Sequence, residues 1–184
     1  MPRVFLGLGS NAGERRLEFL RAAYRQLAVI RDIRIVDASP LYETEPWETE
    51  PGAGIDQQRW HLNCVVAVET TLSPSDLLRQ LQALEMALGR QRPPGTPEEQ
   101  RAAPRTMDID ILLYEDRVVS VPDELHLPHL FLHERAFVLR PLADLAPDLE
   151  HPVLYRTIRE LLEMLSDEHE VRPVPLPRRW FETG

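Results

Sequence analysis

The sequence contains no lysine, and all 21 of its basic residues are arginines. Genome composition alone explains such a bias more readily than function does. The absence nevertheless excludes one class of nucleotide site, because a P-loop needs its lysine on the β- and γ-phosphates. Any phosphate that this chain binds must therefore be held by arginine, by backbone amides or by a metal ion.

Cysteine is nearly absent as well, since Cys64 is the single one among 184 residues. No disulfide framework is possible, and Cys64 lies in an apolar run, as expected of a small buried side chain. No stretch approaches the roughly 20 apolar residues that a membrane span needs, and the first residues lack a signal-peptide pattern. We therefore expect a cytoplasmic protein with no membrane partner.

Positive charge is also scarce relative to negative charge. The 30 acidic residues exceed the basic ones and give a formal net charge of -9. A general nucleic-acid binder would need a basic face, so we expect no nucleic-acid partner. The length favours one domain that can bury a core without disulfides.

Hydrophobic periodicity predicts four strands, at residues 4–8, 33–42, 62–70 and 106–114. Two helices are predicted between them, at residues 14–29 and from Ser73-Pro74 to Gly89. Two long loops, 45–59 and 91–104, are candidates for functional segments. Beyond them, 134–139 is either helix or strand, 155–165 is helical, and 171–181 is an extended, proline-rich tail.

The order β-α-β-β-α-β predicts an α+β fold with a ferredoxin-like core. Such a core is an antiparallel sheet with helices on one side, here followed by C-terminal additions. We expect a single domain over 1–184, with a core of about 3–147 and a C-terminal helix and extended tail over 150–184.

Asp108 and Asp110 are two residues apart in the fourth predicted strand, so their carboxylates share one face while Ile109 and Ile111 enter the other. Two adjacent carboxylates repel each other, and a bound Mg²⁺ would remove that repulsion because hard oxygen ligands suit it. The alternative is a solvated sheet face with arginine partners. The motif alone does not separate these two interpretations.

Three arginines favour the metal interpretation. Arg90 and Arg92 follow the helix end, and Arg105 directly precedes the strand, so all three flank the 91–104 loop. Any one of them alone is an ordinary surface charge. Around a carboxylate pair, they are typical of a phosphoryl-transfer site, where catalysis is mostly positioning and charge neutralisation.

Histidine and amide side chains supply further candidates. His126, His129 and His133 fit no standard zinc spacing, so we favour His129 as a donor to phosphate or ribose. Asn63 lies among apolar neighbours and is either an ordinary buried amide or a reader of a planar heterocycle. Phe137 is either a core residue or a stacking partner for such a ring.

Several blocks occur in the order seen in 6-hydroxymethyl-7,8-dihydropterin pyrophosphokinases, which the chain resembles from its first strand to about Pro147. The blocks are Leu8-Gly9-Ser10-Asn11, Tyr42-x-Thr44, Leu62-Asn63, Glu85 with Gly89-Arg90-x-Arg92, Pro104 to Asp110, Pro128-His129, and Arg135 to Leu142. The block Arg105-Thr106-x-Asp108-x-Asp110 is the most specific of them.

The resemblance implies transfer of pyrophosphate from MgATP to 6-hydroxymethyl-7,8-dihydropterin in folate biosynthesis, with AMP as the second product. It assigns two Mg²⁺ ions to Asp108 and Asp110, and catalytic roles to Arg90, Arg105, Asp108 and Asp110. Residues implied at the ATP site are Gln82, Glu85, Arg92, Arg105, Ile111, His129 and Arg135. Residues implied around the pterin are Thr44, Pro46, Trp47, Asn63 and Phe137. The expected partners are these two small molecules, and the chain is expected to be a monomer, with a dimer as the alternative.

The chain also departs from the family pattern. Ala102 stands where many members have a loop tryptophan, His61 where an aromatic is common, and Leu130 where some have tyrosine. These departures concern the substrate-covering loops. Two competing hypotheses are a metal-dependent phosphohydrolase that uses the same aspartates, and a ferredoxin-like RNA-binding module. The second would need exposed aromatics and a basic surface, where this chain has aspartates and a negative charge.

Overall fold

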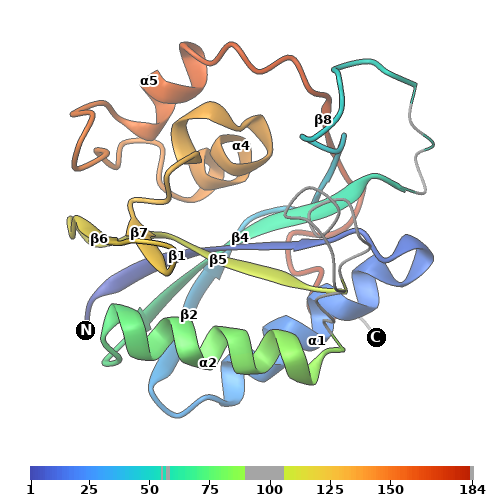
Figure 1. The fold of residues 1–184 in the computed structure, drawn as a ribbon. Coiled ribbons are helices and arrows are strands. Elements are labelled where there is room, and N and C mark those ends of the chain that lie inside the picture. Colours follow the sequence, from blue (N-terminus) through green and yellow to red (C-terminus); the bar gives the residue numbers. More distant parts are fainter. Residues whose placement is uncertain (55, 57–58, 90–105, 183–184) are drawn as a thin grey trace.

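A computed structural model describes residues 1–54, 56, 59–89 and 106–182 of the chain (Figure 1). Six strands form one sheet: β1 (Arg3–Ser10), β2 (Ile33–Ala38), β3 (Tyr42–Thr44), β4 (His61–Thr70), β5 (Asp108–Tyr114) and β8 (Val171–Pro173). Their order is β5-β1-β4-β3-β8, and β2 also pairs with β4. A separate two-stranded sheet contains β6 (Val119–Val121) and β7 (Leu125–Leu127). Every pairing is antiparallel.

The helices lie on both faces of the six-stranded sheet. In Figure 1, α1 (Arg16–Val29) and α2 (Pro74–Ala87) cover one face, and α4 (Ala136–Leu145) and α5 (Ile158–Glu163) lie beyond the other. Short 3₁₀ turns, η1 (Gly13–Arg15) and η3 (Leu132–Glu134), precede α1 and α4. The expectation of helices on one side therefore holds for α1 and α2 alone. It is wrong for α4, which lies within the expected core of 3–147 and covers the opposite face together with α5.

The helix starts follow from local capping. The Ser73 hydroxyl accepts a hydrogen bond from the amide of Asp76 at 3.2 Å, and Pro74 occupies the first turn, where its missing N–H costs nothing. Thr157 and Glu160 form a reciprocal capping box at the start of α5. These pairs satisfy amides that would otherwise lack partners at the helix ends.

The sheet separates two apolar cores, as strand alternation requires. One core lies under α1 and α2 and contains Leu8, Cys64, Ile109 and Ile111. The other lies under α4 and α5 and contains Val65, Leu112 and residues of both helices. The two faces of the sheet at β1, β4 and β5 therefore contribute side chains to different cores.

One expected strand was wrong in detail, and one hairpin was missed. The strand predicted over 33–42 is broken into β2 and β3, because Pro40 has no N–H to continue the ladder. Next to this break, the Ser39 amide donates a hydrogen bond to the Val65 carbonyl of β4 at 2.9 Å. The β6–β7 hairpin was not predicted. The segment 134–139, left open between helix and strand, is helical from Ala136 onward, and the 91–104 loop lies outside the described residues.

The C-terminal tail is built into the fold. β8 adds to the sheet by pairing with β3, and the fully buried Trp180 joins the core under α1 and α2. The indole N–H of Trp180 donates to the Ser39 carbonyl at 3.0 Å, and the Nε of Arg21 donates to the Trp180 carbonyl at 2.8 Å. None of the helices in the described ranges is long and apolar enough to cross a membrane.

Replacing Trp180 tests how much the tail contributes to stability. Trp180→Ala removes a fully buried indole and should lower the free energy of unfolding by about 3–5 kcal/mol. Arg179→Ala, at a side chain 72% exposed, is the matched control and should change it by less than about 0.5 kcal/mol. Urea denaturation followed by circular dichroism gives both values. Equal stability of the two variants would show that the tail is not part of the cooperative fold.

Candidate active site

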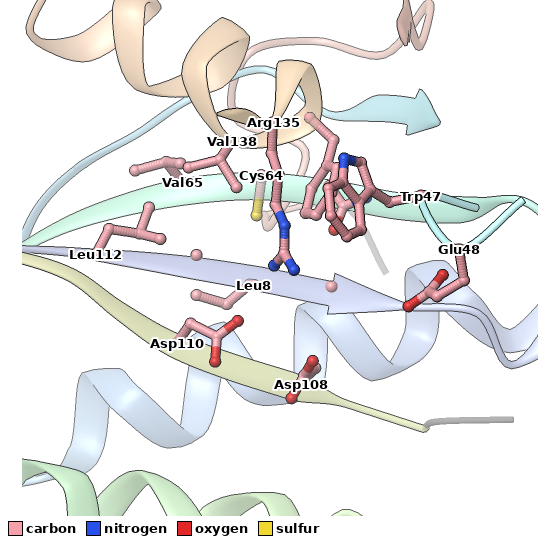
Figure 2. Close-up of a pocket in the computed structure, with 14 residues that line it drawn as sticks. Leu8, Trp47, Glu48, Cys64, Val65, Asp108, Asp110, Leu112, Arg135 and Val138 are labelled. Atoms are coloured by element: carbon pink, nitrogen blue, oxygen red, sulfur yellow. The ribbon is translucent and has the colours of Figure 1, made fainter. Parts of the chain in front are cut away.

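The floor of a cavity is formed where β5, β1 and β4 run side by side. Gly9 pairs with Asp108 on one side and with Asn63 on the other, and Gly7 pairs with Asp110. Directly paired residues share a face, so the two carboxylates and the amide project together across a strip with almost no side chains. Figure 2 shows Asp108 and Asp110 pointing into this cavity, as strand alternation predicts.

Gly9 is required by the position of Asn63. A Cβ placed on Gly9 would lie 2.5 Å from the Asn63 Oδ1, a distance that real Cβ atoms do not adopt. The buried amide of Asn63 in turn donates from Nδ2 to the Thr44 hydroxyl at 2.7 Å. This bond fixes the amide's orientation, with Oδ1 against the glycine strand.

Arg135 provides the cationic wall opposite the aspartates. Its guanidinium carbon lies 4.4 Å from the ring centroid of Trp47, 4.7 Å from that of Phe131 and 5.6 Å from that of Phe137. The rings hold the planar group by cation–π contact while its terminal nitrogens point into the cavity (Figure 2). Its Nε is buried without a hydrogen-bond partner. Burial lowers the pKa of Arg135, and Asp110, Glu48 and Asp108 oppose that shift.

The rim of the cavity comes from the segment after β3. Trp47 and Glu48 line it, and Pro46 precedes them. Phe137 and Val138 line the side nearest α4. Three residues expected around one planar ligand line this cavity: Trp47, Asn63 and Phe137. A fourth, Thr44, contacts Asn63.

A second cavity adjoins the first and shares Asp110 with it. Ile111, His129 and Phe131 line this second cavity, together with Leu78 of α2. Asp110 alone among the described residues lines both. Two ligands seated in the two cavities would therefore both contact Asp110.

His129 is held as a neutral ring. Its Nδ1 accepts a hydrogen bond from the Phe131 amide at 3.2 Å, which leaves Nε2 to carry the proton. Burial, aided by the charge of Arg135, lowers the pKa of His129 to about 4, although Asp108 opposes the shift. At neutral pH the side chain is thus an uncharged N–H donor.

The remaining predicted residues differ in position. Glu85 is buried on α2, and its carboxylate accepts from the Ile109 amide at 2.7 Å, so it supports β5 between the two aspartates. Gln82 is exposed on α2. Arg90, Arg92 and Arg105 lie outside the described residues.

The carboxylate pair is a sparse metal site by itself. Within the described ranges, no group of three or more histidine, cysteine, aspartate or glutamate side chains could hold a metal ion. Mg²⁺ commonly binds through one or two carboxylates while a substrate's phosphates complete its ligands. Two aspartates facing a guanidinium across a cavity fit that arrangement.

Sequence reasoning missed three contributors: Gly7, Glu48 and Phe131. Gly7 and Gly9 alternate in the first strand, and that spacing is a signal for an open strip on one sheet face. Nothing in the sequence placed Phe131 or Glu48 near Arg135, because those contacts depend on how α4 docks. Cys64 is buried, and burial raises the pKa of its thiol, so it is an unreactive core residue.

Comparisons with known proteins agree with one another. A family model described as 7,8-dihydro-6-hydroxymethylpterin-pyrophosphokinase matches residues 5–147. The 2-amino-4-hydroxy-6-hydroxymethyldihydropteridine pyrophosphokinase of Methylorubrum extorquens is 45% identical over 166 residues, which cover 90% of this chain and 95% of the relative. The enzyme of the same name from Pseudomonas aeruginosa is 43% identical over 152 residues, covering 83% and 85%.

Solved structures share the fold. The Plasmodium falciparum HPPK-DHPS structure with pteroate aligns with a TM-score of 0.62 at 19% identity, covering 89% of this chain and 42% of the other. The chain therefore spans about two fifths of the length of that structure. At this level of identity the likeness concerns the fold alone.

The Gly9–Asn63 contact gives a test of the cavity floor. Gly9→Ala should lower the free energy of unfolding by about 1–3 kcal/mol, because the added methyl group clashes with the Asn63 carbonyl oxygen. In an Asn63→Ala background the same change should cost much less, and the double-mutant cycle measures the difference. Identical costs in both backgrounds would contradict the packing described for this strip.

Proposed function

The chain belongs to the 7,8-dihydro-6-hydroxymethylpterin-pyrophosphokinase family, and we propose that the cavity floored by Asp108 and Asp110 is where its two substrates react. The reaction transfers a pyrophosphoryl group from ATP to the hydroxymethyl group of the dihydropterin, in folate synthesis. AMP and the pterin diphosphate are its products. The observation that carries the proposal is that Asp110 lines both adjoining cavities.

The pterin is proposed to occupy the cavity between β4 and α4. Asn63 would hydrogen-bond the edge of the heterocycle, since an amide offers both a donor and an acceptor. Trp47 and Phe137 would supply flat apolar surfaces for its faces, and Thr44 would keep the Asn63 amide oriented. Pro46 precedes Trp47 and would set the direction of the rim.

The ATP is proposed to occupy the second cavity, with its phosphates directed toward Asp110. Ile111 and Leu78 supply an apolar surface for the nucleoside. His129, an uncharged donor at neutral pH, would bond to a phosphate or ribose oxygen. Arg135 would bind phosphate oxygens with a guanidinium already ordered by three rings, so that little entropy is lost on binding. Gln82, Glu85, Arg90, Arg92 and Arg105 remain predicted contributors.

Two Mg²⁺ ions are proposed to be held by Asp108 and Asp110 together with the substrate phosphates. When bound, Mg²⁺ offsets the charge of the triphosphate and lowers the pKa of the attacking hydroxyl. The two carboxylates fix the position at which the triphosphate meets the pterin hydroxyl. The aromatic rim and the apolar surface of both cavities limit the access of water, which would compete as the nucleophile.

We propose that the core of the fold is ferredoxin-like. The strand order β5-β1-β4-β2, with α1 and α2 on one face of these strands, supports this proposal. We propose a single domain, with the core over about 3–147 and the segment 150–184 as an integral addition, because Trp180 packs in the same core as β1. No partner beyond the two small-molecule substrates is needed for this activity, and a monomer is proposed.

Removing either carboxylate tests the reaction and its site together. Asp108→Asn and Asp110→Asn keep side-chain volume but lose the anionic ligand, so kcat for AMP formation from MgATP should fall about 100-fold or more. Asp116→Asn, an exposed aspartate in the turn after β5, is the matched control and should keep the wild-type rate.

Pterin dependence separates this reaction from hydrolysis. The wild-type chain should release AMP when 6-hydroxymethyl-7,8-dihydropterin is present, and release neither AMP nor phosphate when it is left out. Folding of each variant is checked by circular dichroism. Near wild-type rates in the two site variants would overturn the assignment, and nucleotide hydrolysis without pterin would favour a phosphohydrolase.

A further inference from the structure

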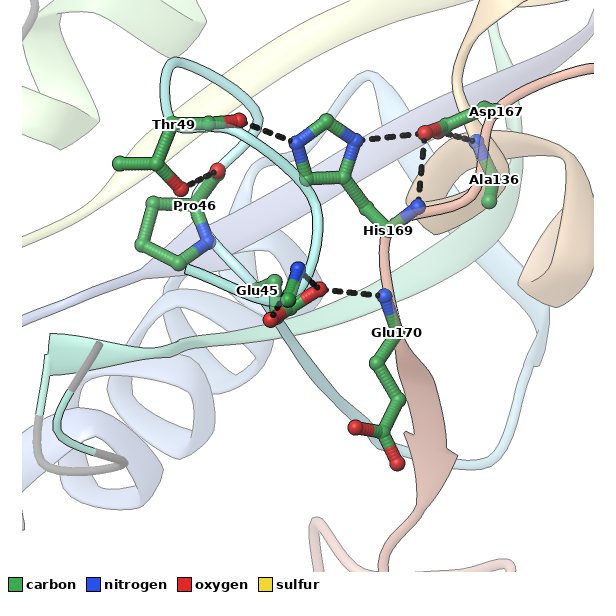
Figure 3. A network of polar contacts seen from close by, with 8 residues as sticks. Glu45, Pro46, Thr49, Ala136, Asp167, His169 and Glu170 are labelled. Carbon is green, nitrogen blue, oxygen red and sulfur yellow. Dashed lines mark hydrogen bonds and ion pairs between the residues drawn. The ribbon is translucent and has the colours of Figure 1, made fainter. Parts of the chain in front are cut away.

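The segment between α5 and β8 reaches back to the rim of the cavity. It contains Asp167, His169 and Glu170, and it lies beyond residues 5–147, which the family model matches. Figure 3 shows it between the segment that follows β3 and the start of α4. These are the two segments that carry Trp47 and Arg135.

His169 connects the tail to the rim. Its Nε2 lies 2.6 Å from the Thr49 carbonyl oxygen, and its Nδ1 lies 2.6 Å from the Asp167 Oδ1. Both side chains are shielded from solvent, with exposed fractions of 11% for His169 and 4% for Asp167. The imidazole therefore bridges two segments that are 120 residues apart in the sequence.

Both contacts require the imidazole to donate. A carbonyl oxygen can only accept, and an ionised carboxylate can only accept, so each ring nitrogen must carry a proton. Burial opposes the charge, but the bonds to Thr49 and Asp167 and the nearby Glu45 outweigh it, so the pKa of His169 is raised. Burial likewise opposes ionisation of Asp167, yet bonds from Ala136 and His169 lower its pKa.

Asp167 extends the connection to α4. Its Oδ2 accepts a hydrogen bond from the Ala136 amide at 2.7 Å, at the first residue of the helix and next to Arg135. Its Oδ1 also accepts from the His169 amide at 3.0 Å. The Asp167 carboxylate thus connects the His169 imidazolium to the start of α4, next to Arg135.

A second carboxylate reinforces the same junction. Glu45 is buried, and its side chain accepts from the Glu170 amide at 2.9 Å and from the Gly52 amide at 3.2 Å. The backbone of Glu45 also donates to the Glu170 carbonyl at 3.0 Å. Glu45 therefore links the two ends of the turn that contains Trp47, and it also links this turn to the tail at Glu170.

We propose that His169 and Asp167 are positioning residues, which hold the Trp47 rim and Arg135 together in the arrangement that receives the substrates. Trp47 lies two residues before Thr49, and Arg135 lies one residue before Ala136, so the pair fastens both sides of the 4.4 Å Trp47–Arg135 contact. The proposal rests on the proposed function, because the substrates are those of the pyrophosphokinase reaction.

Because His169 is positively charged in this bridge, substrate binding should depend on pH. The groups facing His169 are Asp167, Glu45 and the Thr49 carbonyl. A histidine whose folded pKa is raised contributes its stabilisation fully below the unfolded pKa, and loses it as pH rises through the folded pKa. Loss of the ring proton removes one donor and weakens the rim, so substrate binding should weaken on the alkaline side.

The test compares steady-state kinetics of the whole chain with those of His169→Gln and Asp167→Asn, over pH 6 to 9. His169→Gln should raise the KM for the pterin about tenfold at pH 6 to 7 and change kcat by less than about threefold, because a charge-assisted hydrogen bond is lost away from the reacting atoms. Its KM should also lose the alkaline rise of the wild type. Glu168→Gln, exposed on the same segment, is the matched control and should behave as wild type.

A measurement independent of activity completes the test. The nitrogen-15 chemical shifts of His169 in the wild type should show both ring nitrogens protonated at pH 6 and a titration above that of an unfolded histidine, and Asp167→Asn should move that titration to lower pH. A wild-type KM in His169→Gln across the pH range, or a His169 that is neutral at pH 6, would overturn the positioning role. Lack of pterin-dependent AMP formation in the wild type would instead count against the proposed function, and the chemical shifts would still report on the bridge.

Discussion

The antiparallel pairing of β1 with both β4 and β5 is the constraint on which the site depends. That register sets Gly9 between Asp108 and Asn63 and sets Gly7 beside Asp110. Because the glycines carry no side chain, the strip between an acidic strand and an amide-bearing strand stays open. The same pairing buries Leu8 and Ile109 on the other face, so the core that stabilises the sheet also fixes the orientation of the site residues.

Opposite charges face each other across the cavity, with Arg135 on one side and Asp108 and Asp110 on the other. The chain is acidic overall, yet Arg135 is held against three aromatic rings and faces two carboxylates. The rings contact the flat faces of the guanidinium. The N–H donors at its edge therefore remain available for a ligand. Carboxylates opposite it attract cations, which suits a polyphosphate that arrives with magnesium. We propose that this chain, which lacks lysine, binds phosphate through arginine, histidine and metal ions held by its carboxylates.

Local patterns in the sequence predicted much of this arrangement and long-range packing supplied the rest. Strand alternation correctly placed Asp108 and Asp110 on one face and Ile109 and Ile111 in the core, because a period of two depends only on neighbouring residues. The break at Pro40 and the β6–β7 hairpin were not predicted. The bridge from Thr49 to His169 could not be predicted either, since it joins residues 120 positions apart through a tail whose sequence shows no periodicity. The roles of Arg90, Arg92 and Arg105 stay predictions.

The central claim is that Asp108 and Asp110 hold divalent metal jointly with the bound nucleotide. Mn²⁺ binding followed by electron paramagnetic resonance, with a non-hydrolysable ATP analogue and the pterin present, measures this directly. We expect two Mn²⁺ ions per wild-type chain in that complex. The Asp108→Asn and Asp110→Asn variants should each lose at least one of these ions or bind them with much lower affinity. Unchanged stoichiometry and affinity in both variants, each shown to be folded, would contradict a metal site shared by the two aspartates.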